Sequence, residues 1–432
     1  TRVNVTRYAR TRFAFRAGRY NEEVLRRQES NSDFILTFDK GFGDFNVVAQ
    51  VGGINHTNFY KRNYSQVNEL TIDGVYNLGN NASPNTDESL IEESEVNSVF
   101  GSAQFGFKNY LFLDVTARND WSSTLPSDNN SYFYPSVSLS AVITDMLDIQ
   151  SSILSFAKIR GSWAQVGNDA DPYLLQQVFE PEGLWDGSVP KFGESEQIAN
   201  ATLKPEITTG IELGADLRFL NGRLGLDVTY YDQSTRDQIL AVDISRASGY
   251  ESRVLNAGEI TNRGIEVVLN GTIFQLPSGL SWDAAVNFAR NRNEVVELAD
   301  GLESLTLWSI RGASLEARVG EAYGNLYGNK FARTDDGQVI FENGLPTTLD
   351  GQHVIGNIQP DWIGGIQNTL NYKGLSVSAL IDVRMGGDIY DMGTSIARVT
   401  GVLEETALGR EEGVIGQGVK NIGTAENPEY VT

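Results

Sequence analysis

Long polar connections and short turns alternate along this chain, and the segments between them alternate apolar with polar residues. The clearest pair of segments flanks Asn221-Gly222, a dipeptide that favours the tight turn of a β-hairpin. The segment 211–219 has its apolar residues at odd positions, and the segment 224–231 has them at even positions. Because successive side chains of a strand point to opposite faces, each segment is predicted to be a strand with one apolar face.

This alternation predicts thirteen antiparallel strands. They cover residues 3–18, 33–40, 45–60, 94–107, 110–120, 134–144, 156–167, 206–219, 224–235, 262–274, 280–292, 361–372 and 375–388. Six short turns lie at 41–44, 108–109, 145–155, 220–223, 275–279 and 373–374. Seven long connections lie at 19–32, 61–93, 121–133, 168–205, 236–261, 293–360 and 389–432. Short turns at one end and long loops at the other are typical of bacterial outer-membrane β-barrels, whereas a soluble β-sandwich has no reason to keep this parity.

Aromatic residues gather at the ends of the predicted strands. Those beside short turns are Phe105, Phe107, Tyr110, Phe219, Trp282 and Tyr372, and those beside long loops are Phe133, Tyr134, Tyr230, Tyr231 and Trp362. Two girdles at the lipid–water boundaries have this pattern, although Tyr and Phe favour strands in general. We therefore expect an all-β fold, an antiparallel transmembrane β-barrel with long extracellular loops, short periplasmic turns and a polar lumen.

Charge and composition exclude several other classes of protein. The chain has a formal net charge of −22 and no cysteine. A polyanionic surface argues against nucleic acid as a partner, and disulfides and thiolate metal sites are impossible. No apolar run approaches the ~18 residues of a transmembrane helix, which excludes an inner-membrane helix bundle. Residues 1–19 are Arg-rich and show no signal peptide, so we expect an exported protein to have further residues before Thr1.

Seven motifs follow one another along most of the chain. They are NYLFL from 109, RNDWSSTLP from 118, SYFYPSVS from 131, KIRGSWAQVGN from 158, LKPE from 203, NRGIE from 262 and QPDWIGG from 359. Together they resemble the SusC/RagA-like TonB-dependent transporters of Gram-negative outer membranes. The resemblance implies that residues 1–432 are part of one larger barrel of about 22 strands. The plug domain, the TonB box and the C-terminal strands of that family are absent from this sequence. Thirteen strands alone would leave two unpaired edges in lipid, so we expect the whole protein to supply more strands.

The resemblance also implies a function. It implies TonB-dependent import across the outer membrane of a nutrient, an oligosaccharide or an oligopeptide, that is captured by the extracellular loops. The implied partners are a SusD-like surface lipoprotein, the TonB complex acting through the missing plug, and outer-membrane lipid, and the transporter–lipoprotein pair could form a dimer. Two alternatives remain open. A passive porin or surface adhesin would share the barrel and lack the plug, and a soluble all-β glycan-binding protein would need no membrane.

Residues for catalysis are not evident. His56 and His353 are the only histidines, and no HExxH, GxSxG or Walker pattern occurs. We therefore expect no enzyme activity and no metal site. Calcium in the loops is a weaker alternative, because the carboxylates there match no EF-hand spacing and Asp335-Asp336-Gly337 also fits a tight turn. These carboxylates are Asp169, Asp171, Asp335, Asp336 and Glu342.

Four loop aromatics are the candidate substrate-binding residues. Tyr173 and Trp185 lie in the 168–205 connection, and Trp308 and Tyr323 lie in the 293–360 connection. Exposed rings on loops form platforms for sugar rings or peptide side chains, and they also pack loops upon themselves.

Overall fold

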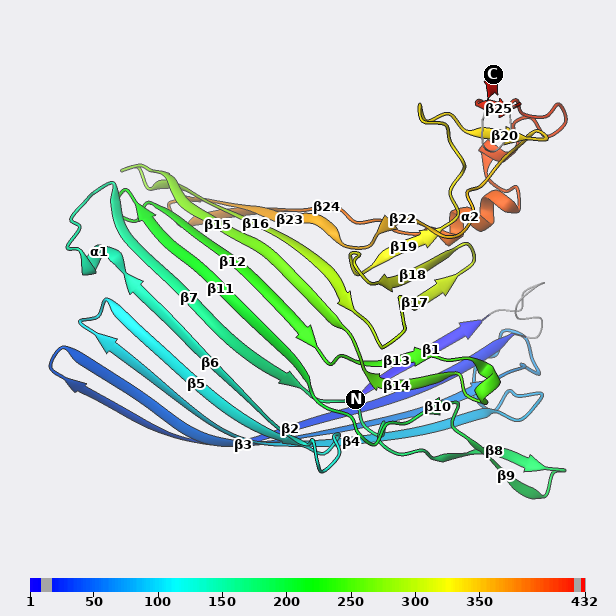
Figure 1. Ribbon diagram of the computed structural model, residues 1–432, viewed down its shortest axis with the longest axis horizontal. Coiled ribbons are helices and arrows are strands. Elements are labelled where there is room, and N and C mark those ends of the chain that lie inside the picture. Colours follow the sequence, from blue (N-terminus) through cyan, green and yellow to red (C-terminus); the bar gives the residue numbers. More distant parts are fainter. Residues whose placement is uncertain (9–17, 423–428, 432) are drawn as a thin grey trace. The chain divides into compact units, whose positions relative to one another are not determined.

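A thirteen-stranded sheet dominates the computed structural model, which describes residues 1–8, 18–422 and 429–431 (Figure 1). Its strands, in sheet order, are β1 (Arg2–Tyr8), β2 (Arg19–Phe42), β3 (Phe45–Val67), β4 (Thr86–Phe107), β5 (Leu111–Ser122), β6 (Ser131–Val142), β7 (Leu154–Asn168), β11 (Glu206–Phe219), β12 (Leu224–Arg236), β15 (Glu259–Gln275), β16 (Leu280–Glu297), β23 (Pro360–Tyr372) and β24 (Leu375–Gly386). The order follows the chain, and the strand pairs whose registers are described are antiparallel. The predicted all-β meander of thirteen strands is therefore confirmed.

The long loops carry small elements of their own. These are β8 (Phe179–Trp185), β9 (Val189–Glu194), β10 (Gln197–Ile198), β13 (Ile239–Asp243), β14 (Ser252–Asn256), β17 (Ser304–Ile310), β18 (Ala313–Arg318), β19 (Asn325–Gly328), β20 (Ile340–Glu342), β21 (Leu345–Pro346), β22 (His353–Asn357), β25 (Val419–Asn421) and β26 (Tyr430–Val431). The helical elements are α1 (Ile143–Met146), α2 (Met392–Val399) and two short 3₁₀ turns, Arg246–Ser248 and Glu404–Thr406. Neither α-helix in the described part of the chain has the length and apolarity needed to cross a membrane.

The chain divides into two compact units. Residues 1–142, 161–210 and 236–256 make up the first unit, and residues 143–160, 211–235 and 257–432 make up the second. Buried side chains gather in small clusters at loop bases. One cluster, in the first unit, is Leu125, Tyr132, Ala170, Leu203 and Val254.

The apolar faces of the strands are uncovered by protein. Phe34 is 69% exposed on β2, and Ile381 is 58% exposed on β24. Soluble proteins rarely leave a large contiguous apolar patch in water, whereas barrel strands turn such a face to lipid. The exposed apolar side chains on one face of these strands therefore agree with the lipid-facing side that the sequence predicts for a membrane barrel.

The extent of the first long strands corrects the sequence prediction. β2 begins at Arg19 and pairs with β3 from Tyr20 to Phe42, so residues 19–32 are strand and not a loop. Because β3 runs to Val67 and β4 begins at Thr86, the predicted 61–93 connection contracts to 68–85. These extensions are mostly polar and show no regular apolar alternation, since a strand that has left the bilayer needs no lipid-facing side. The predicted strand 3–18 corresponds to β1, and its residues 9–17 lie outside the described residues.

The parity of long and short connections has one exception. The connection 143–153, on the side predicted to be short, includes α1 and is longer than the connection 123–130 on the other side. The hydroxyl of Thr144, in α1, accepts a hydrogen bond from the backbone N–H of Ala157 on β7 (3.4 Å). This contact ties the helix to the start of the next strand.

Candidate binding site

A pocket of about 500 Å³ lies in the second unit, where strands β12, β15, β16 and β23 meet the loop that carries β19 and β22. Its walls include Tyr231, Glu266, Asn291, Asn293, Asn325 and Asn357. Amide side chains offer both donors and acceptors, and Glu266 adds acceptors. Such a lining suits ligands rich in hydroxyl or peptide groups, and it does not suit a wholly apolar ligand.

A glycine in the NRGIE motif shapes one wall of this pocket. A Cβ atom on Gly264 would lie 2.4 Å from the Tyr231 ring and 2.6 Å from the backbone oxygen of Arg290. The tyrosine can therefore lie against β15 only because position 264 has no side chain. The Tyr231 hydroxyl donates to Asn291 Oδ1 (3.2 Å), and Asn291 Nδ2 donates to Asn262 Oδ1 (2.9 Å). The motif thus holds the polar wall in place.

A polar network fixes the loop side of the pocket. Asn357 Nδ2 donates to Asn325 Oδ1 (2.7 Å), and Asn325 Nδ2 donates to Glu321 Oε2 (2.8 Å). The Tyr327 hydroxyl also donates to Glu321, and the tyrosine is only 1% exposed. Burial and the bond to Glu321 raise the pKa of Tyr327 to about 12. The Arg318 guanidinium lies 3.7 Å from the centroid of the Tyr327 ring. This side of the pocket is therefore held rigidly by groups that bond one another.

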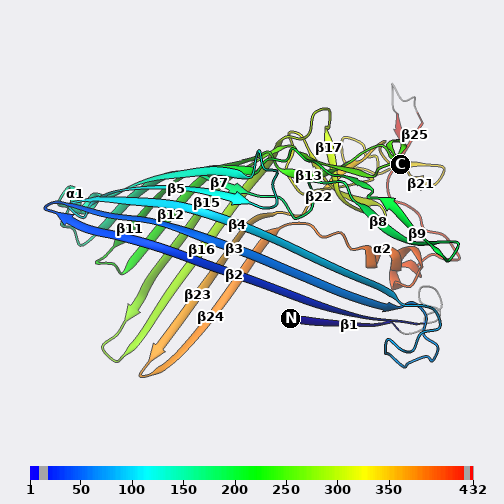
Figure 2. The same ribbon diagram turned by 90° about the horizontal axis from the view of Figure 1, so that it is seen from below.

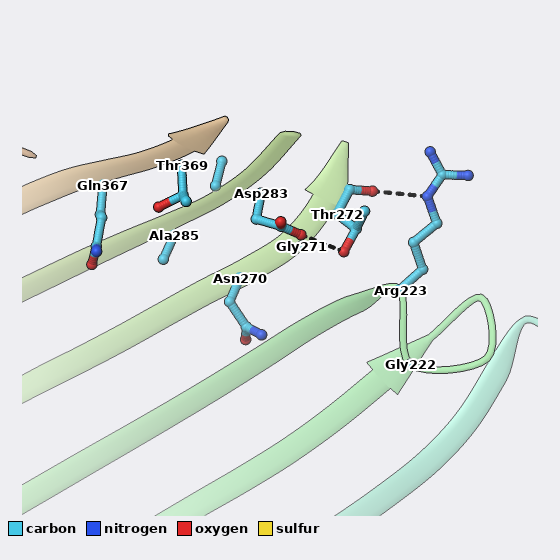
Figure 3. Close-up of a pocket in the computed structure, with 10 residues that line it drawn as sticks. Gly222, Arg223, Asn270, Gly271, Thr272, Asp283, Ala285, Gln367 and Thr369 are labelled. Carbon is cyan, nitrogen blue, oxygen red and sulfur yellow. Dashed lines mark hydrogen bonds between the residues drawn. The ribbon is translucent and has the colours of Figure 1, made fainter. Parts of the chain in front are cut away.

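A second, smaller pocket of about 210 Å³ lies in the same unit, beside the short turns (Figure 3). Asn270, Asp283 and Gln367, drawn in Figure 3, lie on neighbouring strands. The Thr272 hydroxyl donates to Asp283 Oδ1 (2.7 Å), and Arg223 Nε donates to the backbone oxygen of Thr272 (2.8 Å). By the alternation of strand side chains, Asp283 on β16 shares a face with Asn291 of the larger pocket. Strands β15, β16 and β23 therefore carry one polar face with a pocket at each end.

The first unit holds a rigid base for its longest loop. The hydroxyls of Ser122 and Thr124, both buried, donate to the carboxylate of Asp169, the latter over 3.2 Å. Leu203, at the other end of the loop, is fully buried in the cluster around Leu125. Residues of the RNDWSSTLP and LKPE motifs thus hold both ends of the 169–205 loop. These two motifs therefore have a structural role, which is to anchor the ends of the loop.

The four aromatic candidates are not gathered at one of these pockets. Tyr173 and Trp185 belong to the first unit, whereas Trp308 and Tyr323 belong to the second. Tyr173 is exposed, and its hydroxyl accepts a hydrogen bond from the backbone N–H of Glu93 (3.2 Å). Trp185, on the β8–β9 hairpin, and Trp308, on β17, are exposed. Tyr323 is partly buried, and its backbone N–H donates to Asn293 Oδ1 in the 500 Å³ pocket (3.0 Å). Tyr323 alone of the four therefore adjoins the pocket.

Sequence reasoning missed the side chains that line this pocket. The strand pattern places Tyr231 in an aromatic girdle and Glu266 in the NRGIE motif, and it marks neither as a site residue. The sequence does contain a feature that could have indicated this pocket. Glu266, Asn291 and Asn293 are polar residues at the loop ends of adjacent predicted strands.

Two of the five candidate loop carboxylates, Asp169 and Asp336, accept hydrogen bonds from neighbouring side chains. In the described residues, no three His, Asp or Glu side chains come together in a way that could hold an ion. Asp336 accepts hydrogen bonds from Thr334 and from Gln338 Nε2 (2.7 Å), and these bonds, Thr334 first, hold its pKa below the usual value. Gly337, at φ +89°, follows in a turn closed by its N–H to the Thr334 oxygen (2.9 Å). The predicted turn at 335–337 is confirmed.

Comparison with known proteins gives the class of the chain. The family model described as "TonB dependent receptor-like, beta-barrel" matches residues 2–390, so the chain belongs to this family. TonB-dependent receptor P3 of Formosa agariphila is 28% identical over 83% of this chain and 39% of the relative. TonB-dependent receptor P26 of the same organism is 25% identical over 84% of this chain and 39% of its own length. TonB-dependent receptor SusC of Bacteroides thetaiotaomicron is 27% identical over 48% of this chain and 21% of the relative.

Solved structures confirm the fold. The structure of the RagAB peptide transporter superimposes with a TM-score of 0.72 at 22% identity, over 89% of this chain and 45% of that chain. The chain is thus a SusC/RagA-like TonB-dependent receptor and a part of an outer-membrane β-barrel. It spans 39% of the length of the Formosa receptors.

Proposed function

We propose that the whole protein imports a nutrient oligomer across the outer membrane, driven by TonB. The polar face shared by β15, β16 and β23 carries this proposal, because it joins the 500 Å³ pocket beside the loops to the smaller pocket beside the turns. A hydrated ligand moving along a barrel wall needs groups that replace its water at successive positions. The face supplies amides, carboxylates and hydroxyls at both ends.

The pocket chemistry supports an oligosaccharide or an oligopeptide as the imported nutrient. Both ligands expose alternating donors and acceptors, which the amides of Asn291, Asn325 and Asn357 match. Tyr173, Trp185, Trp308 and Tyr323 remain proposed capture residues on the loops. RagAB, whose fold this chain shares, is a peptide transporter, which supports the peptide alternative. A SusD-like lipoprotein would cover the loops, and a plug outside this chain would respond to the TonB complex.

Uptake by cells that carry the whole gene tests this function. Deleting the gene together with redundant paralogues should abolish growth on the oligomer that the protein imports, and deleting tonB should have the same effect. Growth that survives the loss of TonB would indicate a passive porin. Unchanged growth on oligosaccharides and oligopeptides after the gene deletions would contradict import altogether.

Pocket variants refine the test. We expect Asn291→Ala and Glu266→Ala to raise the half-saturation concentration for uptake while the amount of protein in the membrane stays constant. Asn97→Ala, an exposed amide in the first unit outside the pocket, is the matched control and should leave uptake unchanged.

A further inference from the structure

An open strand edge lies on β4 in the first unit. β4 pairs with β3 along its whole length, from Thr86 to Phe107, but with β5 only from Val96 onward. Figure 2 shows β2, β3 and β4 running side by side over their long course. Residues 86–95 therefore have a neighbouring strand on one side only.

The backbone groups along this edge point outward at every second residue. Glu95 N–H donates to the Ser123 hydroxyl (2.9 Å), and Glu93 N–H donates to the Tyr173 hydroxyl (3.2 Å). By the alternation of a β-strand, the N–H and C=O groups of Asp87, Ser89 and Ile91 point the same way. Within the described part of the chain, these backbone groups have no hydrogen-bonding partner on that side. A row of such groups is a template for one more strand.

The edge is strongly acidic. Residues 86–95 contain no Lys or Arg, and their five carboxylates are Asp87, Glu88, Glu92, Glu93 and Glu95. One of them is already paired, since Glu88 lies 3.2 Å from Arg62. The other four lie near the open backbone groups. The edge therefore favours a basic strand and repels an acidic one.

A pocket of about 410 Å³ adjoins the end of the edge. It is lined by Thr57, Phe59, Glu93 and Glu95, among others. No Lys or Arg is among its described lining residues, although the Arg26 guanidinium lies 5.6 Å from the centroid of the Phe59 ring. Two carboxylates and an aromatic ring together suit the end of a Lys or Arg side chain.

The face on which this pocket lies separates it from the transport path. Thr57 and Phe59 share a face of β3 with Val51, and Val51 pairs with the exposed Leu36 of the apolar, lipid-facing side. The pocket thus lies on the same face of the sheet as the lipid-facing apolar residues, beyond the loop-side end of that apolar stretch. A nutrient in the lumen would lie on the opposite face of the sheet. A second copy of this chain would bring the same acidic edge, and the like charges would oppose pairing.

We propose that residues 86–95 bind an extended basic segment of another protein as an added β-strand, with a Lys or Arg side chain in the pocket. The added strand would bond to Asp87, Ser89 and Ile91 through its backbone. Its basic side chains would lie beside the carboxylates of the edge. The site is independent of import, so its failure would leave the proposed transport function untouched.

Peptide binding to the whole protein in detergent tests this edge. The probe is a fluorescently labelled decapeptide of alternating Lys and Val, and its fluorescence polarisation reports the affinity. We expect N-methylation of alternate residues, or Glu in place of Lys, to weaken binding at least about tenfold, because the first removes strand hydrogen bonds and the second reverses the charge. Equal binding of all three peptides would overturn the proposal.

Two variants place the peptide on this edge. Ser89→Pro removes an N–H that points away from β3, so the ladder to β3 stays intact, while Ser89→Ala keeps the N–H as a matched control. We expect Ser89→Pro to weaken binding about tenfold and Ser89→Ala to leave it near that of the parent protein. The double variant Glu93→Gln and Glu95→Gln changes no backbone group. It should also weaken the binding of the basic peptide. Binding that survives both changes would overturn the proposal, as would self-association of the protein that Ser89→Pro abolishes.

Discussion

Arg160 on β7 reaches across the neighbouring strand to bind Asp227 on β12. Nη1 donates to Oδ2 (2.8 Å), and Nη2 donates to Oδ1 (2.7 Å) and to the Thr229 hydroxyl (2.6 Å). Strand β11 lies between the two strands in the sheet. The guanidinium crosses it at Gly214, where a Cβ atom would lie 2.6 Å from Arg160 Nε. The missing side chain therefore makes the ion pair possible.

The first prediction concerns this crossing. Gly214→Ala should displace the flexible end of Arg160 and separate it from Asp227. Because both side chains are more than a third exposed, we expect a loss of only about 0.5–1 kcal/mol in the free energy of unfolding, measured by denaturant unfolding in lipid vesicles. Gly41→Ala, where an added Cβ meets nothing within 4 Å, is the control. In an Asp227→Asn background the effect of Gly214→Ala should shrink, and an undiminished effect would contradict this explanation.

The second prediction concerns the glycine under Tyr231. An added methyl group at Gly264 would meet the backbone oxygen of Arg290 at 2.6 Å, and a backbone atom cannot swing aside as an arginine tip can. We expect Gly264→Ala to cost about 1–3 kcal/mol, more than Gly214→Ala under the same conditions. The tyrosine should also leave its place in the pocket, which a crystal or cryo-EM structure of the variant would show. A smaller loss of unfolding free energy than that caused by Gly214→Ala would contradict the close packing of Tyr231 and the Arg290 backbone against Gly264.

The third prediction concerns the base of the 169–205 loop. Asp169→Ala removes the carboxylate that accepts from both buried hydroxyls, so that Ser122 and Thr124 can bond only each other (2.9 Å), at a local cost of about 1–3 kcal/mol. We expect faster hydrogen–deuterium exchange over residues 169–175 and new proteolytic cleavage in the loop. Asp171→Ala, two residues away and exposed, should change neither measurement. The same increase in both variants would show that the hydroxyl contacts do not hold the loop.

The fourth prediction concerns the titration of Tyr327. Burial and the bond to Glu321 raise the pKa of Tyr327 from its ordinary value of 10 to about 12. The folded state therefore favours the neutral phenol, and its contribution to stability is complete below pH 10 and is lost as the pH rises through about 12. The near-ultraviolet absorbance of tyrosinate should show one fewer high-pH transition in Tyr327→Phe. Glu321→Gln should move that transition to lower pH, and an unmoved transition would contradict the assigned cause.

The fifth prediction concerns the start of α2. Asp391 caps this helix, because Oδ1 accepts from Thr394 N–H (2.9 Å) and Oδ2 accepts from its hydroxyl (2.5 Å). The hydrogen bonds from Thr394 lower the pKa of Asp391 below its ordinary value of 3.8. The cap therefore stabilises the helix above that value, and its contribution is lost as the pH falls through the lowered pKa.

Hydrogen–deuterium exchange over 392–399 measures the cap. At neutral pH, Asp391→Ala should speed the exchange, and Asp391→Asn, which keeps an acceptor but does not titrate, should slow it again. The exchange of the Asn variant, corrected for intrinsic rates, should stay constant in acid where that of the parent protein rises. Equal acid sensitivity in the two proteins would exclude Asp391 as the titrating group.

The sequence by itself determined that the chain forms a meander of thirteen antiparallel strands, which the described residues show. Contact with lipid imposes a period of two residues that each strand must satisfy locally, as 211–219 and 224–231 do. The same reason explains why the prediction of a loop at residues 19–32 was wrong. Those residues are held as strand by their partners on β3 rather than by a lipid-facing pattern, so they have no periodic signature.

Only the tertiary structure decided which polar residues meet. Arg160 and Asp227 lie on strands separated by a third, and their pairing depends on a glycine in that third strand. Tyr231, Glu266 and Asn291 share a pocket because of the order and register of β12, β15 and β16. The alternation within one strand gives the face of a side chain, whereas its neighbours across the sheet come from hydrogen bonding between segments distant along the chain.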